Sequence, residues 1–367
     1  MAGAIMKAVV CNESGPPSVL HLQHDFPRPV VEPGKVLLRV QAFSMERMDI
    51  MIRQGIAPRP PSRPKVLGSG CIGIVEDVSD ELKRHDEAED EENIGARGAK
   101  YRKGDIVAVV MGGREAEFNG CYAEYTLLPP SCLSSPLNSL VDSSQLSFSN
   151  LAAIPSAFLT AYNILTWSLH IIPEDTLMVH GGSTAIGMAT GMLAKNLLGV
   201  KKVVGTTRSW SKMNKMRKAG FDHVIVVPPS EVSSPPDPLV TYLKAEAKEM
   251  EGLTAQLVLL GSTHIPVALA CAKTPGRSRV CMAGMLAGQY FMVDKFSPMA
   301  IPIGVSISGY SSSFIDHMAP LRMLVQAVID GKIETNLDKV FSMADIIQAH
   351  EYSDANLACG KVVCLIE

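Results

Sequence analysis

The sequence lacks the cysteine arrangements that mark zinc sites and secreted folds. Its 367 residues include eight cysteines, but no CxxC pair and no close cluster with the spacing of a zinc site. We therefore expect reduced, mostly buried thiols, no metal centre and a cytoplasmic location.

An excess of one charge and a long apolar run are also missing. The 34 basic and 37 acidic residues give a net charge of −3, so the chain has no excess of basic residues that would predict nucleic-acid binding. No apolar run approaches the roughly 18 residues of a membrane helix, and Lys7 interrupts the short apolar start, which has no signal-peptide core. We expect a protein whose partner is a small-molecule substrate, with no nucleic acid or membrane.

Two regular sequence patterns are present instead. The first third carries short β-type runs separated by Pro and Gly, such as Val36 to Ala42, and predicts a mainly β domain. From about Ser149 an apolar helical stretch, Leu151 to Leu169, leads into alternating strands and helices, which indicate a parallel sheet. The strands of that sheet are expected at Thr176 to Val179, Lys202 to Gly205, His223 to Val227, Gln256 to Leu260, Arg279 to Ala283 and Val305 to Ser308.

Two further segments are predicted to be loops. In His85 to Glu92, six of eight residues are acidic, and such mutually repelling carboxylates belong in water. This segment is expected to be a solvated loop, with a partner-binding tail as the alternative. The proline-rich segment Pro228 to Pro238 is expected to be a loop within one domain.

A glycine-rich turn lies between the first predicted strand of the parallel sheet and the helix that follows it. This order brings backbone N–H groups and a helix N-terminus to a pyrophosphate. The motif by itself is weak, and a purely structural turn stays open. His180, just before the turn, is expected to be a hydrogen-bonded core histidine. The predicted cofactor contacts are Gly182, Ser183, Thr184, Ala185, Ile186 and Gly187.

The end of the next predicted strand bears on the choice of cofactor. Proteins that prefer NAD place an acidic residue there for the ribose 2′-hydroxyl, and residues 205–212 contain none. Arg208 and Lys212, with Thr207 and Ser209, can instead pair with a 2′-phosphate. We therefore predict NADPH as the cofactor, the alternative being that the two cations are ordinary solvated charges at a helix start.

Several collinear blocks carry a family resemblance across nearly the whole chain. They include Asp49-x3-Arg53-x-Gly55, Pro64-Lys65-Val66-Leu67-Gly68, Gly104-Asp105-Ile106-Val107, Gly120-x-Tyr122-Ala123-Glu124-Tyr125, Ala152-Ala153-Ile154-Pro155, Gly284-Met285-Leu286, Ala349-His350 and Gly360-Lys361-Val362-Val363. On these blocks the chain resembles the medium-chain dehydrogenase/reductase superfamily, quinone oxidoreductase branch.

The resemblance implies an α/β fold of two domains with the active site in the cleft between them. A GroES-like, mainly β catalytic domain is expected over 1–148 and 309–367, and a Rossmann domain with a doubly wound parallel sheet over 149–308. It also implies hydride transfer from the nicotinamide and a homodimer formed through the Rossmann sheet edge. Further cofactor contacts are implied at Gly284, Met285, Leu286 and Lys361.

Departures from the family pattern argue against a metal. Zinc alcohol dehydrogenases of this superfamily carry a Cys where this chain has Glu46 and a His-Glu pair at Ser69-Gly70. Serine and glycine cannot replace those ligands, so no metal site is expected. Without that Lewis acid, reduction of an activated double bond is more feasible than reversible alcohol oxidation.

The candidate catalytic residues are Glu46 and Tyr310. Zinc-free relatives have Asn at the position of Glu46 and Tyr at that of Met51. Glu46 is interpreted either as an acid or as a surface or ion-paired side chain, and Tyr310 either as a substrate-side group or as packing at the domain seam. Met45, Met48 and Met51 form an adaptable apolar pocket or core filling.

Together these observations predict a zinc-independent, NADPH-dependent oxidoreductase that transfers hydride to an enone, quinone or enoyl thioester. A non-catalytic dinucleotide-binding protein and an enzyme that catalyses a non-redox rearrangement remain as alternatives.

Overall fold

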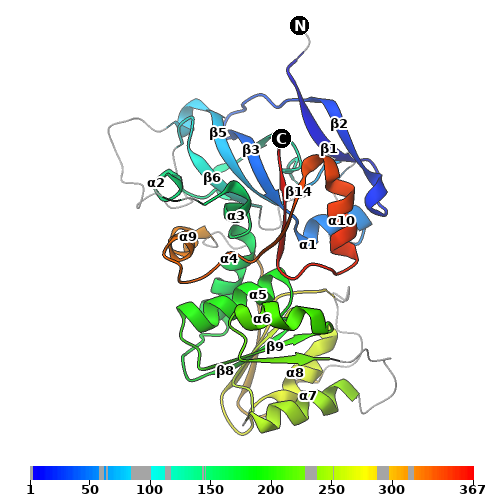
Figure 1. Ribbon diagram of the computed structural model, residues 1–367, viewed down its shortest axis with the longest axis vertical. Coiled ribbons are helices and arrows are strands. Elements are labelled where there is room, and N and C mark those ends of the chain that lie inside the picture. Colours follow the sequence, from blue (N-terminus) through cyan, green and yellow to red (C-terminus); the bar gives the residue numbers. More distant parts are fainter. Residues whose placement is uncertain are drawn as a thin grey trace. The chain divides into compact units, whose positions relative to one another are not determined.

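The computed structural model describes residues 3–57, 62, 65–83, 101–111, 117–142, 144, 146–227, 238–250, 252–286, 297–312 and 318–367. The acidic segment His85 to Glu92 and residues 228–237 of the proline-rich segment lie outside these ranges. The chain forms two compact units (Figure 1). The first unit comprises residues 1–159, 312–331 and 337–367, and the second comprises 160–311 and 332–336.

The first unit is built on two sheets. A three-stranded sheet has the order β2-β1-β4, and a larger sheet has the order β14-β15-β3-β5-β6, with β7 also paired to β3. Strand β3 is mostly apolar, with Arg39 and Gln41 as its interior polar residues, and it is buried along most of its length, as expected of a strand covered on both faces. The strands are β1 (Ile5–Cys11), β2 (Leu20–Pro27), β3 (Val36–Ser44), β4 (Lys65–Val66), β5 (Gly70–Val78), β6 (Ile106–Val110), β7 (Tyr125–Leu128), β14 (Leu337–Ser342) and β15 (Lys361–Leu365).

Short helices complete this unit. They are α1 (Arg47–Gln54), α2 (Asn138–Val141), α3 (Phe148–Ala152), most of α4 (Pro155–Asn163), α9 (Leu321–Ile329) and α10 (Ile346–Asp354). The single helical stretch expected from Leu151 to Leu169 is interrupted after α3. It restarts at Pro155, because proline has no N–H to donate and is favoured in the first turn of a helix.

The second unit contains one six-stranded sheet, all of whose neighbouring strands are parallel. The strand order is β10-β9-β8-β11-β12-β13, so chain order reverses between β8 and β11. This is the doubly wound order of a Rossmann domain, which confirms the predicted fold class. The strands are β8 (Thr176–His180), β9 (Lys202–Thr207), β10 (His223–Val226), β11 (Ala255–Val258), β12 (Ser278–Met282) and β13 (Val305–Gly309).

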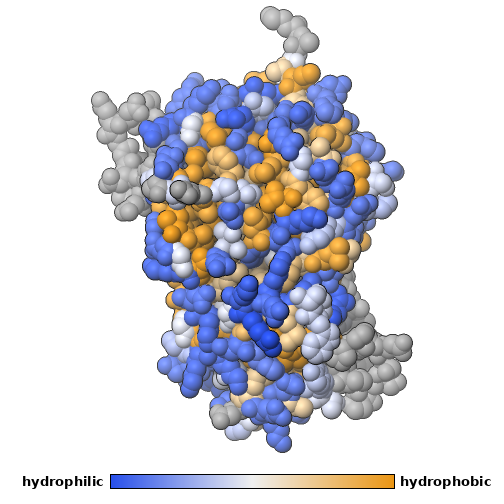
Figure 2. Space-filling model, viewed as in Figure 1, coloured by the Kyte–Doolittle hydropathy of each residue, from blue (hydrophilic) through white to orange (hydrophobic). Residues whose placement is uncertain are grey.

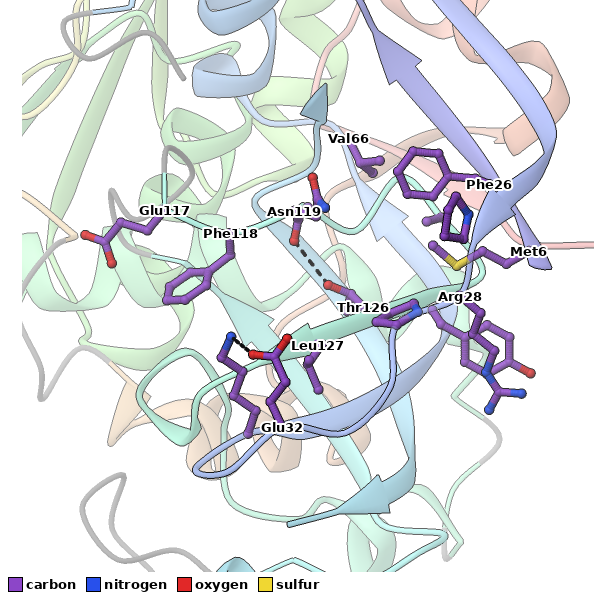
Figure 3. A pocket seen from close by; sticks show the side chains of 16 residues that line it. Met6, Phe26, Arg28, Glu32, Val66, Glu117, Phe118, Asn119, Thr126 and Leu127 are labelled. Atoms are coloured by element: carbon purple, nitrogen blue, oxygen red, sulfur yellow. Dashed lines mark hydrogen bonds and ion pairs between the residues drawn. The ribbon is translucent and has the colours of Figure 1, made fainter. Parts of the chain in front are cut away.

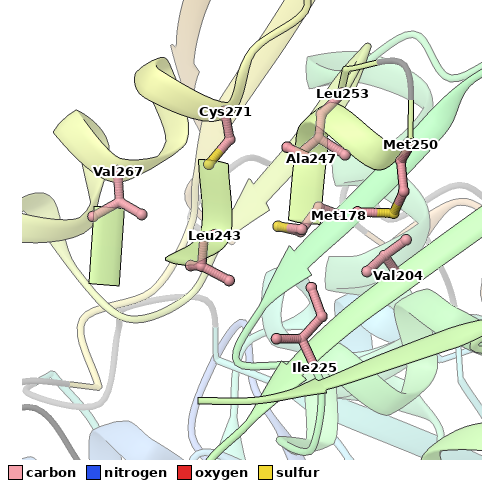
Figure 4. Packing of buried hydrophobic residues seen from close by; sticks show 9 residues of the cluster. All are labelled: Met178, Val204, Ile225, Leu243, Ala247, Met250, Leu253, Val267 and Cys271. Atoms are coloured by element: carbon pink, nitrogen blue, oxygen red, sulfur yellow. The ribbon is translucent and has the colours of Figure 1, made fainter. Parts of the chain in front are cut away.

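Helices pack on this sheet and bury its apolar side chains. They are α5 (Ala185–Met192), α6 (Met213–Lys218), α7 (Pro238–Glu249) and α8 (Ile265–Cys271). In one cluster, Met178, Val204 and Ile225 point from three neighbouring strands toward Leu243 of α7 and Val267 of α8 (Figure 4). Burial of this kind stabilises the fold by roughly 25 cal/mol per Å² of apolar surface.

The surface carries no sign of a membrane segment among the residues that the structure places. None of their helices combines the length and apolar character that a bilayer crossing requires. On the face shown in Figure 2, hydrophilic residues predominate over the second unit, whereas apolar residues reach the surface mainly over the first.

Candidate functional site

The glycine turn lies at the carboxyl end of β8 and is fixed to the neighbouring strand. Gly181 has a φ of 92°, a conformation that favours glycine. Its N–H donates to Thr206 Oγ1 at 3.0 Å, and the N–H of Gly182 donates to Thr206 O at 2.9 Å. A Cβ on Gly182 would lie 3.1 Å from Gly205 Cα of β9, so the turn packs closely over this strand.

Helix α5 begins at this turn with a side-chain cap. Thr184 Oγ1 accepts from the N–H of Gly187 at 3.0 Å and donates to Gly181 O at 2.9 Å. The N–H groups of Ala185 and Ile186 have no acceptor among the residues that the structure describes. Two amides at a helix N-terminus are therefore available to an anion.

Gly187 lets the helix start directly against the turn. A Cβ at this position would lie 2.5 Å from Gly181 O and 2.7 Å from Gly182 O, distances that no side chain tolerates. The structure thus brings the six predicted residues, Gly182 to Gly187, into one compact turn.

The end of β9 lies beside the turn. Thr207 Oγ1 donates to Ser183 Oγ at 3.2 Å, and the N–H of Ser209 donates to Thr207 Oγ1 at 3.3 Å. Arg208 is exposed and Lys212 is buried. Of the four side chains predicted to bind the 2′-phosphate, Thr207 ends the strand and contacts the turn, and the other three belong to the segment that follows.

Trp210 was not singled out from the sequence. It lies between Ser209 and Lys212, and its side chain is 74% exposed. An exposed indole in a segment rich in cations is a surface on which a planar base can stack.

The loop after β12 reaches the same edge of the sheet. The N–H of Leu286 donates to Leu259 O at 3.2 Å, and a Cβ on Gly284 would lie 2.5 Å from that oxygen. Gly284 is therefore required by the close approach of two backbones. Met285 is half-buried beside it.

Tyr310 follows β13, and its backbone N–H donates to Met282 O at the end of β12. Its hydroxyl accepts a hydrogen bond from Asn163 Nδ2 at 3.3 Å. Burial raises the pKa of Tyr310 to about 12, although the bond from Asn163 acts in the opposite direction. The phenol therefore keeps its proton at neutral pH.

His180 is a core residue, as predicted. Its Nε2 lies 3.0 Å from Gln256 Oε1 of the adjacent strand β11. Burial lowers the pKa of His180 to about 4, so the ring is neutral at physiological pH.

In the first unit, Glu46 is the centre of a polar cluster. Ser44 Oγ and Ser156 Oγ each donate to Glu46 Oε1 at 2.6 Å, and Lys361 Nζ lies 2.5 Å from the same oxygen. Lys361 Nζ also donates to Ser156 Oγ at 3.0 Å. In the structure Glu46 is an ion-paired side chain, which is one of its two interpretations. The contact of Lys361 with the cofactor stays a prediction.

The sequence did not identify Ser44 or Ser156 as members of this cluster. Ser156 is 110 positions from Glu46 and 205 from Lys361. The four residues come from β3, the start of α1, α4 and β15, and only the tertiary fold brings them together.

A second polar group includes Ser69, one of the positions aligned with the zinc-ligand pair of the zinc enzymes. Ser69 Oγ donates to Asp49 Oδ1 at 2.9 Å, and the hydroxyl of Tyr122 lies 3.3 Å from Asp49 Oδ2. A Cβ on Gly70 would lie 3.0 Å from Ser44 Oγ. Within the part of the chain that the structure describes, no three His, Cys, Asp or Glu side chains are placed to hold a metal.

The three methionines differ in burial. Met45 and Met51 are buried, and the hydroxyl of Tyr122 lies 3.2 Å from Met45 Sδ. Both side chains therefore belong to the core of the first unit, whereas Met48 is half-buried.

One pocket of the first unit contains none of the predicted site residues. It lies between the loop after β2, the residues preceding β7 and β7 itself (Figure 3). Three of its charged side chains are engaged, since Arg28 lies over the ring of Tyr125 at 3.9 Å and Lys35 pairs with Glu32 at 2.6 Å.

Comparison with known families gives two matches. A profile described as alcohol dehydrogenase GroES-like domain matches residues 32–136, and one described as zinc-binding dehydrogenase matches residues 219–364.

Individual relatives match over most of the chain. A quinone oxidoreductase of Lama guanicoe is 30% identical over 99% of this chain and 98% of its own length. A zinc-type alcohol dehydrogenase-like protein of Schizosaccharomyces pombe is 25% identical, with 92% of each chain covered. Among solved structures, a mycobacterial protein in complex with NADPH has a TM-score of 0.79 at 24% identity and covers 98% of this chain and 99% of its own.

Proposed function

Because the chain belongs to the quinone oxidoreductase branch of the medium-chain dehydrogenases/reductases, and is an oxidoreductase by that membership, we propose that its specific activity is the NADPH-dependent, zinc-independent reduction of an enone, quinone or enoyl thioester. The observation that carries the proposal is the turn after β8. There the amides of Ala185 and Ile186 are available to a diphosphate, beside a strand end that has cations and no carboxylate.

The residues at this edge fit a phosphorylated dinucleotide. Gly182 and Gly187 allow the close packing of the turn and the helix start that a Cβ would block, and this packing fits the amides of the helix start to a diphosphate. Arg208 is exposed, and its planar guanidinium suits a phosphate monoester. Thr207 and Ser209 add hydroxyl donors at the same strand end. This donor set supports NADPH over NADH.

The chemistry rests on the cofactor, which when bound supplies a hydride to an electron-poor carbon. The chain contributes binding, orientation and a proton. Tyr310 is our candidate proton donor, because its pKa of about 12 keeps the hydroxyl protonated and Asn163 holds that oxygen in place. A phenol of this pKa is a weak acid, so its proton suits a strongly basic enolate.

The polar clusters of the first unit support a reaction without zinc. Glu46 stands where zinc relatives have a thiolate, and its Oε1 already receives Lys361, Ser44 and Ser156. An ammonium group beside that carboxylate disfavours a divalent cation there through like-charge repulsion.

Assembly and location complete the proposal. We propose a homodimer formed through the β13 edge of the parallel sheet, near which Met299 and Ile303 are almost fully exposed. All eight cysteines are buried as thiols, which supports a reducing compartment such as the cytoplasm.

The test is a binding titration followed by a turnover screen. Calorimetry is expected to show NADPH binding at least tenfold tighter than NADH binding. Absorbance of the reduced cofactor is then expected to fall when enones, quinones or enoyl thioesters are added. Tight NADPH binding without turnover of any of these substrates would favour a non-catalytic dinucleotide-binding protein. Substrate conversion without NADPH would instead identify a non-redox rearrangement.

A further inference from the structure

A short segment of the chain, residues 332–336, returns to the second unit between α9 and β14. Its last residue, Asn336, is only 4% exposed. The side-chain Nδ2 donates to Ala185 O at 2.6 Å. Asn336 is thereby held against the first turn of α5, whose amides are available to the diphosphate.

The other half of this amide has no partner. Asn336 Oδ1 is buried and accepts no hydrogen bond. Exchanging its oxygen and nitrogen would not help, because two oxygens would then face each other at Ala185. Leaving a buried acceptor without a donor is costly, on the order of 1–3 kcal/mol, and such groups in native proteins need an explanation.

This unpaired atom is distinctive within its unit. Three other buried side-chain atoms of the described residues share the property: Arg47 Nε, Ser79 Oγ and His350 Nε2. All three belong to the first unit. Asn336 Oδ1 is therefore the single buried side-chain atom without a hydrogen-bond partner in the described part of the second unit, and it lies beside the glycine turn after β8.

We propose that Asn336 Oδ1 accepts a hydrogen bond from the nicotinamide half of the bound dinucleotide, so that Asn336 is a cofactor-contacting residue. This inference rests on the proposed function. An amide oxygen can only accept, so its partner is a ribose hydroxyl or the carboxamide N–H and not an ionised phosphate.

The nicotinamide half is favoured by the arrangement of donors and cations. The 2′-phosphate end of the cofactor is drawn to Thr207, Arg208 and Ser209 at the end of β9, where the side chains match its charge. Asn336 is instead attached to Ala185, on the helix that follows the turn. The ligand that satisfies its oxygen is then the part of the dinucleotide beyond the diphosphate.

The experiment compares wild type, Asn336→Leu and Asn196→Leu by calorimetry. Asn196 is an exposed residue later in the same helical segment, so its variant is a matched control. The ligands are NADP⁺, its acetylpyridine analogue, which lacks the carboxamide N–H, and 2′,5′-ADP, which lacks the nicotinamide half. Asn336→Leu is expected to weaken NADP⁺ binding about tenfold and to leave 2′,5′-ADP binding within twofold of wild type.

The analogue identifies the donor. If the carboxamide N–H is the donor, Asn336→Leu leaves the affinity for the acetylpyridine analogue unchanged. If a ribose hydroxyl is the donor, the variant lowers the affinities for NADP⁺ and for the analogue equally. Equal losses for all three ligands would mean that Asn336 only supports the turn, and no loss would mean that its oxygen is not used. Either outcome overturns the inference. Failure of the proposed function looks different: without a dinucleotide site, wild type itself would bind none of the ligands, and without catalysis the turnover screen would fail while the binding comparison stays valid.

Discussion

Lys361 and Glu46 form a buried ion pair, with Nζ 2.5 Å from Oε1 and the two side chains 3% and 17% exposed. Burial makes this pair differ from the surface pairs of the same unit, such as Lys35 with Glu32 at 2.6 Å, where Glu32 is 59% exposed. Nearly equal N–O distances therefore correspond to different contributions to stability.

Removing the carboxylate leaves the Lys361 ammonium buried without its counter-charge. We expect Glu46→Gln to lower the free energy of unfolding by about 2–4 kcal/mol. Glu32→Gln, the matched surface control, is expected to change it by less than about 0.5 kcal/mol. Urea denaturation measures both. The double variant Glu46→Gln/Lys361→Met should recover part of the lost stability. Equal losses for Glu46→Gln and Glu32→Gln would show that burial of the pair is unimportant.

Arg208 is expected to distinguish the two dinucleotides. Arg208→Glu should weaken NADPH binding tenfold or more, because a carboxylate repels the 2′-phosphate, and should leave NADH binding nearly unchanged. Arg217→Glu makes the same charge change at an exposed position of α6 and should alter neither affinity. A parallel loss of both cofactors would contradict the assignment.

Trp210 provides an optical signal for the same segment. The chain has two tryptophans, and both are exposed, Trp167 by 51% and Trp210 by 74%. We expect NADPH to quench the fluorescence of the Trp167→Phe variant, which keeps Trp210, and to leave that of Trp210→Phe unchanged. The reverse pattern would place the cofactor elsewhere on the second unit.

Gly187 can be tested against a glycine of the same unit that has room. Gly187→Ala places a Cβ 2.5 Å from Gly181 O and should cost about 1–3 kcal/mol of stability together with most NADPH affinity. A Cβ on Gly309 meets only Met282 O at 3.9 Å, so Gly309→Ala should be nearly neutral. Thermal unfolding and calorimetry check the pair, and similar results for both would refute the close-approach argument.

Two neutral, buried histidines predict loss of stability in acid. Burial lowers the pKa of His180 to about 4, and burial together with Arg53 lowers that of His350 to about 3. Both values lie below the roughly 6.5 of an unfolded chain, where histidine therefore binds more protons. Stability is then fully present above about pH 6.5 and is lost as pH falls toward the folded values.

At pH 5 each histidine should have cost roughly 2 kcal/mol relative to pH 7.5. His350→Asn is expected to flatten the pH dependence of urea midpoints between pH 7 and 5. An unchanged slope would mean that His350 is not a source of the acid sensitivity.

Local patterns predicted the second unit well, and its sheet shows why. Its inner strands β8, β9, β11 and β12 are largely buried and alternate with helices along the chain, so apolar runs and helical periodicity alternate visibly. The turn at Gly181 is equally local. All six predicted strands of that sheet and the fold class are confirmed.

The remaining features depend on partners that are distant in sequence. Strands β2 and β14 contain His, Gln, Asp and Lys, and they form because β1 and β15 provide hydrogen-bonding edges. The pairing of Glu46 with Lys361 and the attachment of Asn336 to Ala185 have no counterpart in any local pattern. In the sequence alone, Glu46, Lys361 and Asn336 cannot be distinguished from ordinary polar residues of the surface.

The position of β15 has a consequence for biosynthesis. This strand, Lys361–Leu365, lies between β14 and β3 inside the larger sheet of the first unit. During translation, β3 therefore lacks β15, one of its antiparallel neighbours, until more than 300 further residues have been made. Residues 160–311 meanwhile supply all six strands of the parallel sheet. We expect the nucleotide-binding unit to become compact on the ribosome first, and the β-rich unit to complete its larger sheet only when β15 has emerged.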